Sequence, residues 1–196
     1  MWEKNYAIGL DNGGTVTKAA LFDFFGHELC VVSYKTQVVS LRPGYNERDM
    51  ESVWEANCAC VRELIKKSGI TPGQIAGVAV CGHGKGLYLW GKDGKPARAG
   101  ISSTDNRAWE IAKRWQTDGT WKDVYPKICQ QLMACQQAAL LRWVKENEPW
   151  VYENIAWVFS VKDYVRFRLT GEAWCEMTDI SGSGLMDIKN RRYDIG

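Results

Sequence analysis

The sequence predicts an α/β domain whose mixed sheet is built in the order β-β-β-α-β, with helices on both faces. Three strand-like segments come first, an amphipathic helix follows, and a short continuous apolar run at 75–81 comes after that helix. Consecutive strands favour an antiparallel meander, whereas a strand reached through a crossover helix favours parallel pairing. At 196 residues the chain can bury one core and is most simply one domain.

The predicted meander covers 6–10, 17–22 and 28–37. The helix that follows is predicted to begin after Asp49, a favourable N-cap residue, and to end at Gly69. Its apolar stripe consists of Met50, Val53, Trp54, Cys58, Val61, Leu64 and Ile65.

The apolar run at 75–81 is typical of a central strand buried on both faces. Beyond it, turn signals and hydrophobic periodicity predict two more strands and three more helices. Trp109 is expected on the apolar face of the first of these helices, and Leu169 on that of the last. The strands are predicted at 87–90 and 155–160, and the helices at 106–116, 136–148 and 161–169.

Composition favours small-molecule partners. The chain is 45% hydrophobic and 24% charged, with a net charge of +2, and it has no block of like charges that would indicate binding to nucleic acid or to a membrane surface. The start of the sequence lacks the basic and apolar segments of a leader, and no apolar run approaches the roughly 20 residues of a membrane helix. We therefore expect a cytoplasmic protein.

The seven cysteines lie in apolar or helical contexts without a Cys-x-x-Cys pair, so we expect reduced and mostly buried thiols. Cys58 and Cys60 would project about 200° apart on a helix, which argues against a zinc site.

The segment from Gly9 to Lys18 is the most informative, because a strand-like run meets an acidic residue, two glycines, a hydroxyl and a positive charge. A carboxylate can hold a metal ion or its waters, and glycines let backbone N–H groups approach a phosphate. An apolar strand follows instead of a helix, so the phosphates would lie over a hairpin turn and not in a Walker loop. The alternative is a simple tight turn. The candidate phosphate-binding residues are Asp11, Asn12, Gly13, Gly14, Thr15 and Lys18, with Asp11 also the candidate metal ligand.

Two further polar clusters follow strands or precede helices. The turn at 82–86 combines three glycines with His83 and Lys85, which suits a hydroxylated ligand, although a flexible loop would have the same composition. Asp105 can accept two hydroxyl hydrogen bonds while Arg107 orients its carboxylate, but Asp105 also suits a helix N-cap.

The segment 9–23 resembles the first phosphate motif of sugar kinases with the actin-like, ribonuclease-H-like ATPase fold. Later segments resemble one branch of these proteins, the FGGY carbohydrate kinases, so that the resemblance spans nearly the whole chain. Within the family, Gly84-Lys85-Gly86 and the Ser102-Ser103 pair most resemble the L-xylulose kinase type. The matching segments are 43–49, 82–86, 105–107, 141–149 and 163–171.

The resemblance implies an ATP-dependent kinase that phosphorylates a small ketose or polyol with Mg²⁺. It implies that the candidate phosphate-binding residues contact ATP. Ser103 stands where the family commonly has an aromatic residue. The general base and the adenosine pocket are expected in a second domain beyond Gly196, so we expect 1–196 alone to be inactive. Substrate contacts are implied for His83, Gly84, Lys85, Asp105 and Arg107.

Other classes of function stay open at this stage. A non-catalytic module that binds a sugar or a protein partner could use the same half-cleft, and a chaperone-like or actin-like nucleotide switch could use the same fold. The polar clusters at 82–86 and 105–107 argue against the switch. A homodimer is among the expected assemblies.

Overall fold

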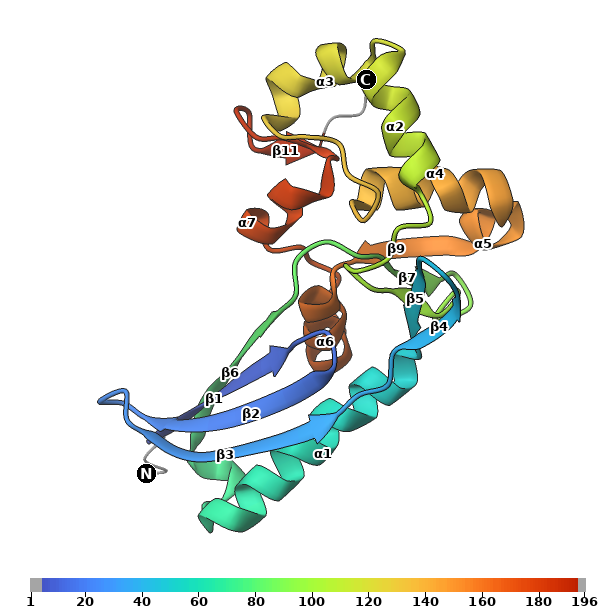
Figure 1. Cartoon of the computed structure of the whole chain (residues 1–196). Helices are drawn as coiled ribbons and strands as arrows, with labels where there is room; N and C mark the ends of the chain where they lie inside the picture. Colours follow the sequence, from blue (N-terminus) through green and yellow to red (C-terminus); the bar gives the residue numbers. More distant parts are fainter. Residues whose placement is uncertain (1–4, 194–196) are drawn as a thin grey trace.

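The computed structural model describes residues 5–193, and its centre is a mixed four-stranded sheet in the spatial order β3-β2-β1-β6 (Figure 1). The first three strands form an antiparallel meander, and β6 lies parallel to β1. Helix α1 makes the crossover to β6, so the predicted β-β-β-α-β order is confirmed. The strands are β1 (Tyr6–Asn12), β2 (Val16–Asp23), β3 (Glu28–Lys35) and β6 (Ile75–Gly82).

Helix α1 (Met50–Ser68) has the predicted ends. Asp49 accepts a hydrogen bond from the backbone N–H of Ser52 at 2.6 Å, and Gly69 adopts a left-handed conformation with φ of 70°. The predicted apolar stripe is confirmed only in part. Cys58 is half-buried, and the polar residue Asn57 lies in the buried face of the helix. The buried residues of α1 are Met50, Val53, Asn57, Cys60 and Leu64.

Helices α1 and α6 (Val161–Thr170) cover the same face of the sheet. Ile8 and Leu10 of β1 point to this face and share one core with Tyr164 of α6 and with the buried face of α1. Val31, on the opposite face, is 44% exposed. The fold class is as predicted, but among residues 5–193 the helices that pack on this sheet lie on one face and not on both.

Strand β6 lies at an edge of the sheet, and the prediction that it is buried on both faces was wrong. Val78 is 43% exposed. The reason is that β9 (Ile155–Phe159) pairs antiparallel with β7 (Tyr88–Gly91) and does not extend the sheet beside β6. The apolar strand β9 is likewise not buried on both faces, since Trp157 in its centre is 51% exposed.

A three-stranded sheet in the order β4-β5-β8 was not predicted. It consists of β4 (Val39–Arg42), β5 (Tyr45–Arg48) and β8 (Gly100–Ile101). The β4–β5 hairpin turns at Gly44, whose φ is 81°, and the Pro-Gly pair before β5 was a turn signal that could have revealed it.

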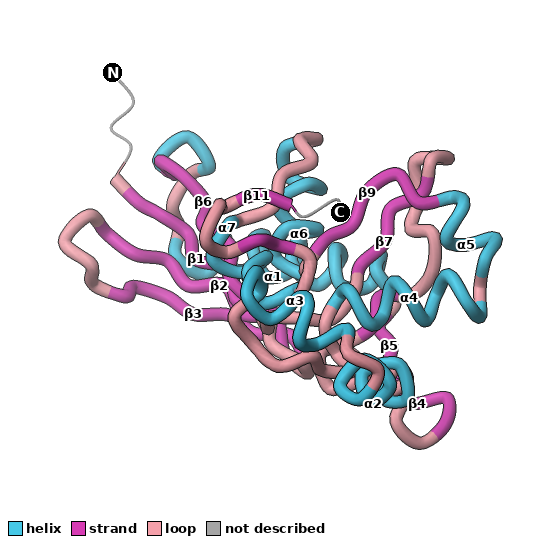
Figure 2. Tube along the Cα trace, turned by 90° about the horizontal axis from the view of Figure 1, so that it is seen from above, coloured by secondary structure: helices cyan, strands magenta, loops and turns pink. Residues whose placement is uncertain are grey.

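Helices α2 to α5 and α7 gather beyond the carboxyl ends of β1 and β6 (Figure 1). Seen from above, α4 and α5 lie on the right and the β1–β3 meander on the left (Figure 2). α2 begins three residues later than predicted, and Trp109 is 48% exposed instead of buried. The remaining elements are η1 (Pro72–Gln74), α2 (Trp109–Thr117), α3 (Thr120–Ile128), α4 (Gln137–Asn147), α5 (Pro149–Asn154), α7 (Met177–Ile180), η2 (Ser181–Ser183), β10 (Met186–Asp187) and β11 (Arg192–Tyr193).

Helices α4 and α6 were predicted to within a residue or two, whereas α3, α5 and α7 were not predicted. α4 lies inside the predicted range 136–148, and α6 ends at Gly171, whose φ is 76°. Leu169 was expected in the core but is 46% exposed. The buried residues of α6 all lie in its first half, between Val161 and Val165.

All seven cysteines are free thiols, as predicted. Cys60 is buried, but Cys81 and Cys129 are exposed, so the expectation of mostly buried thiols holds only in part. No group of three metal-ligating side chains occurs among residues 5–193. In the same part of the chain, none of the helices has the length and apolar character needed to cross a membrane.

Candidate active site

The β1–β2 hairpin ends in a turn formed by Gly13, Gly14 and Thr15. The N–H of Gly13 donates to the carbonyl of Val16 at 3.0 Å. Neither glycine has φ in the left-handed region, so the turn does not need glycine for its backbone angles. A Cβ on Gly14 would meet nothing within 4 Å, which leaves the backbone open to a ligand. The turn therefore has an accessible backbone at Gly14, which a phosphate-binding role requires.

Charged and hydroxyl side chains flank the turn on its exposed side. Asp11 and Lys18 lie directly opposite each other in the β1–β2 register, and Thr15 is exposed at the tip. The Cys81 thiol donates to Oδ1 of Asp11 at 3.6 Å, and no other hydrogen bond to this carboxylate is found among the described residues. Asp11 therefore has free oxygen lone pairs. Mg²⁺ typically uses one or two carboxylates together with waters and phosphate oxygens, so Asp11 fits a magnesium site.

Asn12 differs from its neighbours because its side chain is buried. Its amide donates to Oδ1 of Asn57 at 3.1 Å, and the Asn57 amide donates back to Oδ1 of Asn12 at 2.7 Å. The Thr17 hydroxyl donates to the same oxygen at 3.4 Å. The Asn12 side chain thus holds the hairpin on α1. Because the whole residue is buried and its carbonyl accepts from His83, the predicted phosphate contact at Asn12 is wrong.

The turn at 82–86 lies beside the phosphate turn. Asn12 and Gly82 are partners in the parallel β1–β6 register, and the N–H of His83 donates to the carbonyl of Asn12 at 3.0 Å. A Cβ on Gly82 would lie 2.9 Å from that carbonyl oxygen and 2.8 Å from Val161. The close approach of the two turns therefore requires glycine at this position.

His83 and Lys85 are the polar side chains of this second turn. Nε2 of His83 lies 3.2 Å from the hydroxyl of Tyr88. Burial, and then the positive charge of Arg48, lowers the pKa of His83 below 6.5, so its imidazole is neutral at neutral pH. Lys85 adopts a left-handed backbone with φ of 62°, and its half-buried ammonium has no hydrogen-bond or ion-pair partner among residues 5–193.

Asp105 and Arg107 are close together, but their polar atoms are already paired. Oδ1 of Asp105 accepts from the backbone N–H and from Nε of Arg107 at 2.8 and 3.0 Å. Oδ2 accepts from Nη2 of Arg107 at 2.8 Å and from the N–H of Asn46 at 2.7 Å. Both side chains are almost fully buried. Asp105 is not the N-cap of α2, a position that Ala108 occupies.

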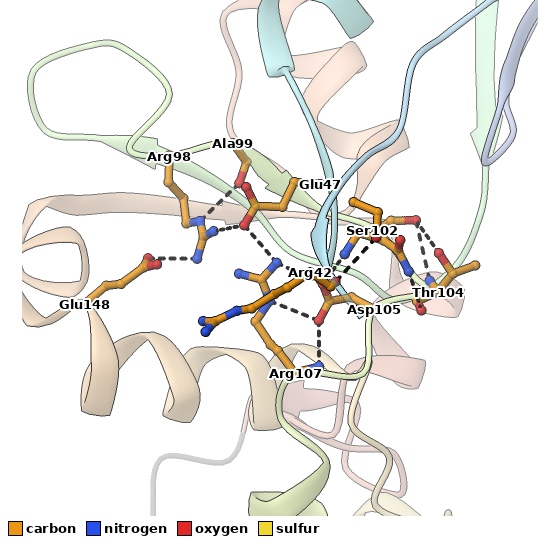
Figure 3. Close-up of polar contacts among 11 residues, drawn as sticks. Arg42, Glu47, Arg98, Ala99, Ser102, Thr104, Asp105, Arg107 and Glu148 are labelled. Atoms are coloured by element: carbon orange, nitrogen blue, oxygen red, sulfur yellow. Dashed lines mark hydrogen bonds and ion pairs between the residues drawn. The ribbon is translucent and has the colours of Figure 1, made fainter. Parts of the chain in front are cut away.

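A chain of alternating charges continues from this pair (Figure 3). Nη2 of Arg107 is 2.8 Å from Glu47, which also pairs with Arg98, and Arg98 pairs with Glu148 at 2.7 Å. The chain joins β5, the segment before β8, the junction between α4 and α5, and the turn before α2. These residues therefore connect elements that lie far apart in the sequence.

The sequence predicts direct substrate contacts for Asp105 and Arg107, but in the structure both side chains are paired with other groups of the protein. All four of the hydrogen bonds that the carboxylate can readily accept come from the protein itself. Arg107 is in addition enclosed by aromatic rings, with its guanidinium carbon 4.4 Å from the ring centre of Tyr45 and 5.0 Å from that of Trp143. This pair fixes the backbone around the site, and the free polar groups are at the two turns.

Arg48 and Asp179 also lie at the site, and sequence analysis assigned no role to either. Arg48 is fully buried and donates to the carbonyl of Gly13 at 3.0 Å. Asp179 lies beside Gly84, where a Cβ would be 3.4 Å from its Oδ1, and it pairs with Lys162 at 3.7 Å. The only sequence signal for Arg48 was its place beside Asp49 in the 43–49 segment. The sequence could not show that its charge is buried, because that depends on the tertiary fold.

The residues of the two turns line neither of the two larger cavities described for residues 5–193. These cavities, of about 520 and 620 Å³, lie elsewhere. The first is lined by apolar residues of β9 and of the segment after α6, and the second by residues of β5, α2 and α4.

Comparison with known proteins gives the family. The model of the FGGY family of carbohydrate kinases, N-terminal domain, matches residues 6–196. A probable L-xylulose kinase of Pasteurella multocida is 41% identical over 97% of this chain and 39% of its own length. An L-xylulose/3-keto-L-gulonate kinase of Escherichia coli is 41% identical over 96% of this chain and 38% of its own length.

Solved structures agree with the sequence comparison. The ligand-bound xylulose kinase of Lactobacillus acidophilus superposes with a TM-score of 0.91 at 26% identity, covering 97% of this chain and 38% of that protein. The chain thus spans less than half of the length of these relatives. The family match over 6–196, together with the matching fold, shows that the chain belongs to the FGGY family of carbohydrate kinases and corresponds to the N-terminal domain.

Proposed function

We propose that this chain supplies the sugar-contacting and phosphate-contacting part of an ATP-dependent kinase that transfers the γ-phosphoryl group to a hydroxyl of a small ketose or polyol. One observation carries the proposal. The open glycine turn after β1 and the polar turn after β6 lie side by side, joined by the hydrogen bond from His83 to Asn12 at 3.0 Å. A donor phosphate on one turn and an acceptor hydroxyl on the other would then be neighbours, as phosphoryl transfer requires.

On the phosphate side, the backbone of Gly13 and Gly14 is accessible, and Thr15 and Lys18 add a hydroxyl and a positive charge. Asp11 would hold Mg²⁺, directly or through water. ATP supplies the phosphoryl group, and the metal ion balances the charge of its oxygens. The protein contributes position and electrostatic complementarity, which are the main protein contributions to reactions of this class.

On the acceptor side, the neutral imidazole of His83 can donate one hydrogen bond and accept one, and the Lys85 ammonium can donate up to three. The backbone of Gly84 is exposed between them. Asp105 and Arg107 enter the proposal as positioning residues, because their paired and buried side chains hold the segment that follows Ser102 and Ser103, which adjoin Gly86 of the acceptor turn. An L-xylulose-like ketose is the first substrate to test, since two relatives at 41% identity carry that sugar in their names.

The proposal leaves the general base and the adenosine pocket to residues outside this chain. Asp11 is an unsuitable base if it holds the metal ion. Nε2 of His83 is engaged by the Tyr88 hydroxyl at 3.2 Å, which leaves the other ring nitrogen for a substrate hydroxyl. The relatives are matched over only 38–39% of their length. We therefore expect 1–196 to bind sugar and phosphate without turnover, and a homodimer remains a prediction.

Calorimetric titration with L-xylulose, other ketopentoses and pentitols tests the proposal. We expect saturable binding that Lys85→Met weakens, because the variant removes an unpaired ammonium from the acceptor turn. Lys95→Met is the matched control, since Lys95 is exposed at the distant turn after β7. Binding of no sugar, or equal weakening by both variants, would contradict the assignment of the acceptor turn.

A further inference from the structure

Arg48 is a buried, positively charged residue that contacts the glycine turn after β1. Its side chain is fully buried, and among residues 5–193 it forms no ion pair. Nη1 donates to the carbonyl of Gly13 at 3.0 Å and Nη2 to the hydroxyl of Thr36 at 2.7 Å, whereas Nε has no hydrogen-bond partner. A buried cation without a carboxylate is unfavourable for folding. Such a charge is better explained by a ligand of opposite sign than by stability.

The position of this charge identifies the ligand. The carbonyl that Arg48 holds belongs to the open glycine turn, and the guanidinium lies on its buried side. On the exposed side, Asp11 and Lys18 carry opposite charges directly across from each other. These two roughly cancel, so Arg48 gives the turn a net positive charge. Its charge also reaches the second turn, where it contributes to the low pKa of His83.

We infer that Arg48 is a positioning residue for the phosphate site, which fixes the glycine turn through the Gly13 carbonyl and supplies the positive potential that attracts a multiply charged phosphate chain. The inference rests on the proposed function. Because the guanidinium is buried, it acts across the turn and not by direct contact with the phosphate. The same charge that is unfavourable in the free protein becomes favourable when the phosphate is bound.

Titration of the chain with magnesium tripolyphosphate tests this inference without an adenosine pocket. Arg48→Gln removes the charge, and Arg48→Met is a second neutral variant that keeps the test possible if the first does not fold. We expect the neutral variants to bind tripolyphosphate about tenfold more weakly or worse, since a full charge near the ligand is lost. Arg48→Lys keeps the charge and should bind nearly as well as the original chain.

Thr36→Val is the matched structural control, because it removes one hydrogen-bond partner of Arg48 and leaves the charge in place. It should alter the free energy of unfolding more than it alters tripolyphosphate affinity. A neutral Arg48 variant that binds tripolyphosphate as well as the original chain overturns the inference but leaves the phosphate turn intact. Failure of the original chain to bind tripolyphosphate overturns the proposed phosphate turn, and the role of Arg48 with it.

The pKa of His83, followed by NMR, gives a second readout that a merely structural role would not move. The chain has two histidines, so His27→Gln identifies the His83 signal. Asp179 and the Gly84 carbonyl raise this pKa, whereas burial and Arg48 lower it. Arg48→Gln should therefore raise the pKa of His83, while Thr36→Val should not. An unchanged pKa in Arg48→Gln would contradict a field that reaches both turns.

Discussion

Adjacent residues of the phosphate motif have different tasks, because successive side chains of a strand point to opposite faces. Asp11 is exposed beside Lys18, whereas Asn12 is buried against Asn57 of α1. The order of residues in the motif does not by itself show that Asp11 is exposed and Asn12 is buried. Because side chains alternate along the strand, the Asp11 carboxylate faces solvent, whereas the Asn12 side chain faces α1 and holds the turn in place.

The paired amides give a stability prediction. Asn57→Ala leaves the buried amide of Asn12 without its partner, so the free energy of unfolding should fall by about 1–3 kcal/mol. Urea unfolding followed by circular dichroism measures the change. Asn106→Ala, at an exposed position, is the control and should be nearly neutral. A neutral Asn57→Ala would show that the amide pair is not needed to hold the hairpin.

His83 predicts how stability depends on pH. Its pKa in the folded chain is lowered, so the unfolded chain binds more protons near and below the ordinary value of 6.5. The contribution of His83 is present above pH of about 6.5 and is lost as pH falls towards the lower folded pKa. The free energy of unfolding measured from pH 8 to pH 5 should therefore fall less steeply in His83→Gln than in the original chain. His27→Gln, at an exposed position, should leave the slope from His83 in place, and identical slopes in all three proteins would refute the prediction.

At the scale of elements, the ends of β1 and β6 are held together by backbone contact at one glycine. Gly82→Ala would place a Cβ 2.9 Å from the Asn12 carbonyl and 2.8 Å from Val161, so it should destabilise the chain by roughly 1–3 kcal/mol. Gly77→Ala lies in the same strand with nothing within 4 Å and should be nearly neutral. Thermal unfolding of the two variants makes the comparison. Equal stability would mean that the two turns can move apart without cost.

The charge chain around Glu47 gives a second prediction at this scale. Glu47→Gln removes the negative charge shared by Arg98 and Arg107, which are both largely buried, so it should destabilise the chain by about 3–5 kcal/mol. Glu146 also pairs with two arginines, Arg114 and Arg142, but at the surface. Glu146→Gln should therefore cost less than about 1 kcal/mol. Similar losses in chemical unfolding would show that burial does not decide the strength of these pairs.

For the whole molecule, ligand binding on both turns should stabilise the folded chain. A ligand present at 100 times its Kd adds about 2.7 kcal/mol, which for a chain of this size raises Tm by roughly 5–10 °C. Scanning fluorimetry with L-xylulose and with magnesium tripolyphosphate measures the shifts. Asp11→Asn should reduce the magnesium-dependent part of the tripolyphosphate shift and leave the sugar shift unchanged. A Tm that neither ligand moves would count against both turns as binding sites.

Local signals predicted the elements that have clear ends. The cap at Asp49, the left-handed glycines at 69 and 171, and the period of α4 were all readable, because capping and hydrophobic period depend on neighbouring residues. The exposure of Val78 and Trp157 was not readable. An apolar strand has the same local pattern whether it lies in the centre of a sheet or at its edge, and the pairing of β9 with β7 decided between them.

The sequence by itself determined the family, the order β-β-β-α-β and the two glycine turns, because these depend on motifs and periods that a short segment carries. Only the tertiary structure decided that the turns adjoin each other, that Asp105 and Arg107 pair with each other, and that Arg48 is buried behind Gly13. Each of these facts joins residues brought together by sheet register and by packing of distant segments. The sequence shows that a residue is charged, but it does not show whether water, a carboxylate or a bound phosphate surrounds that charge in the folded chain.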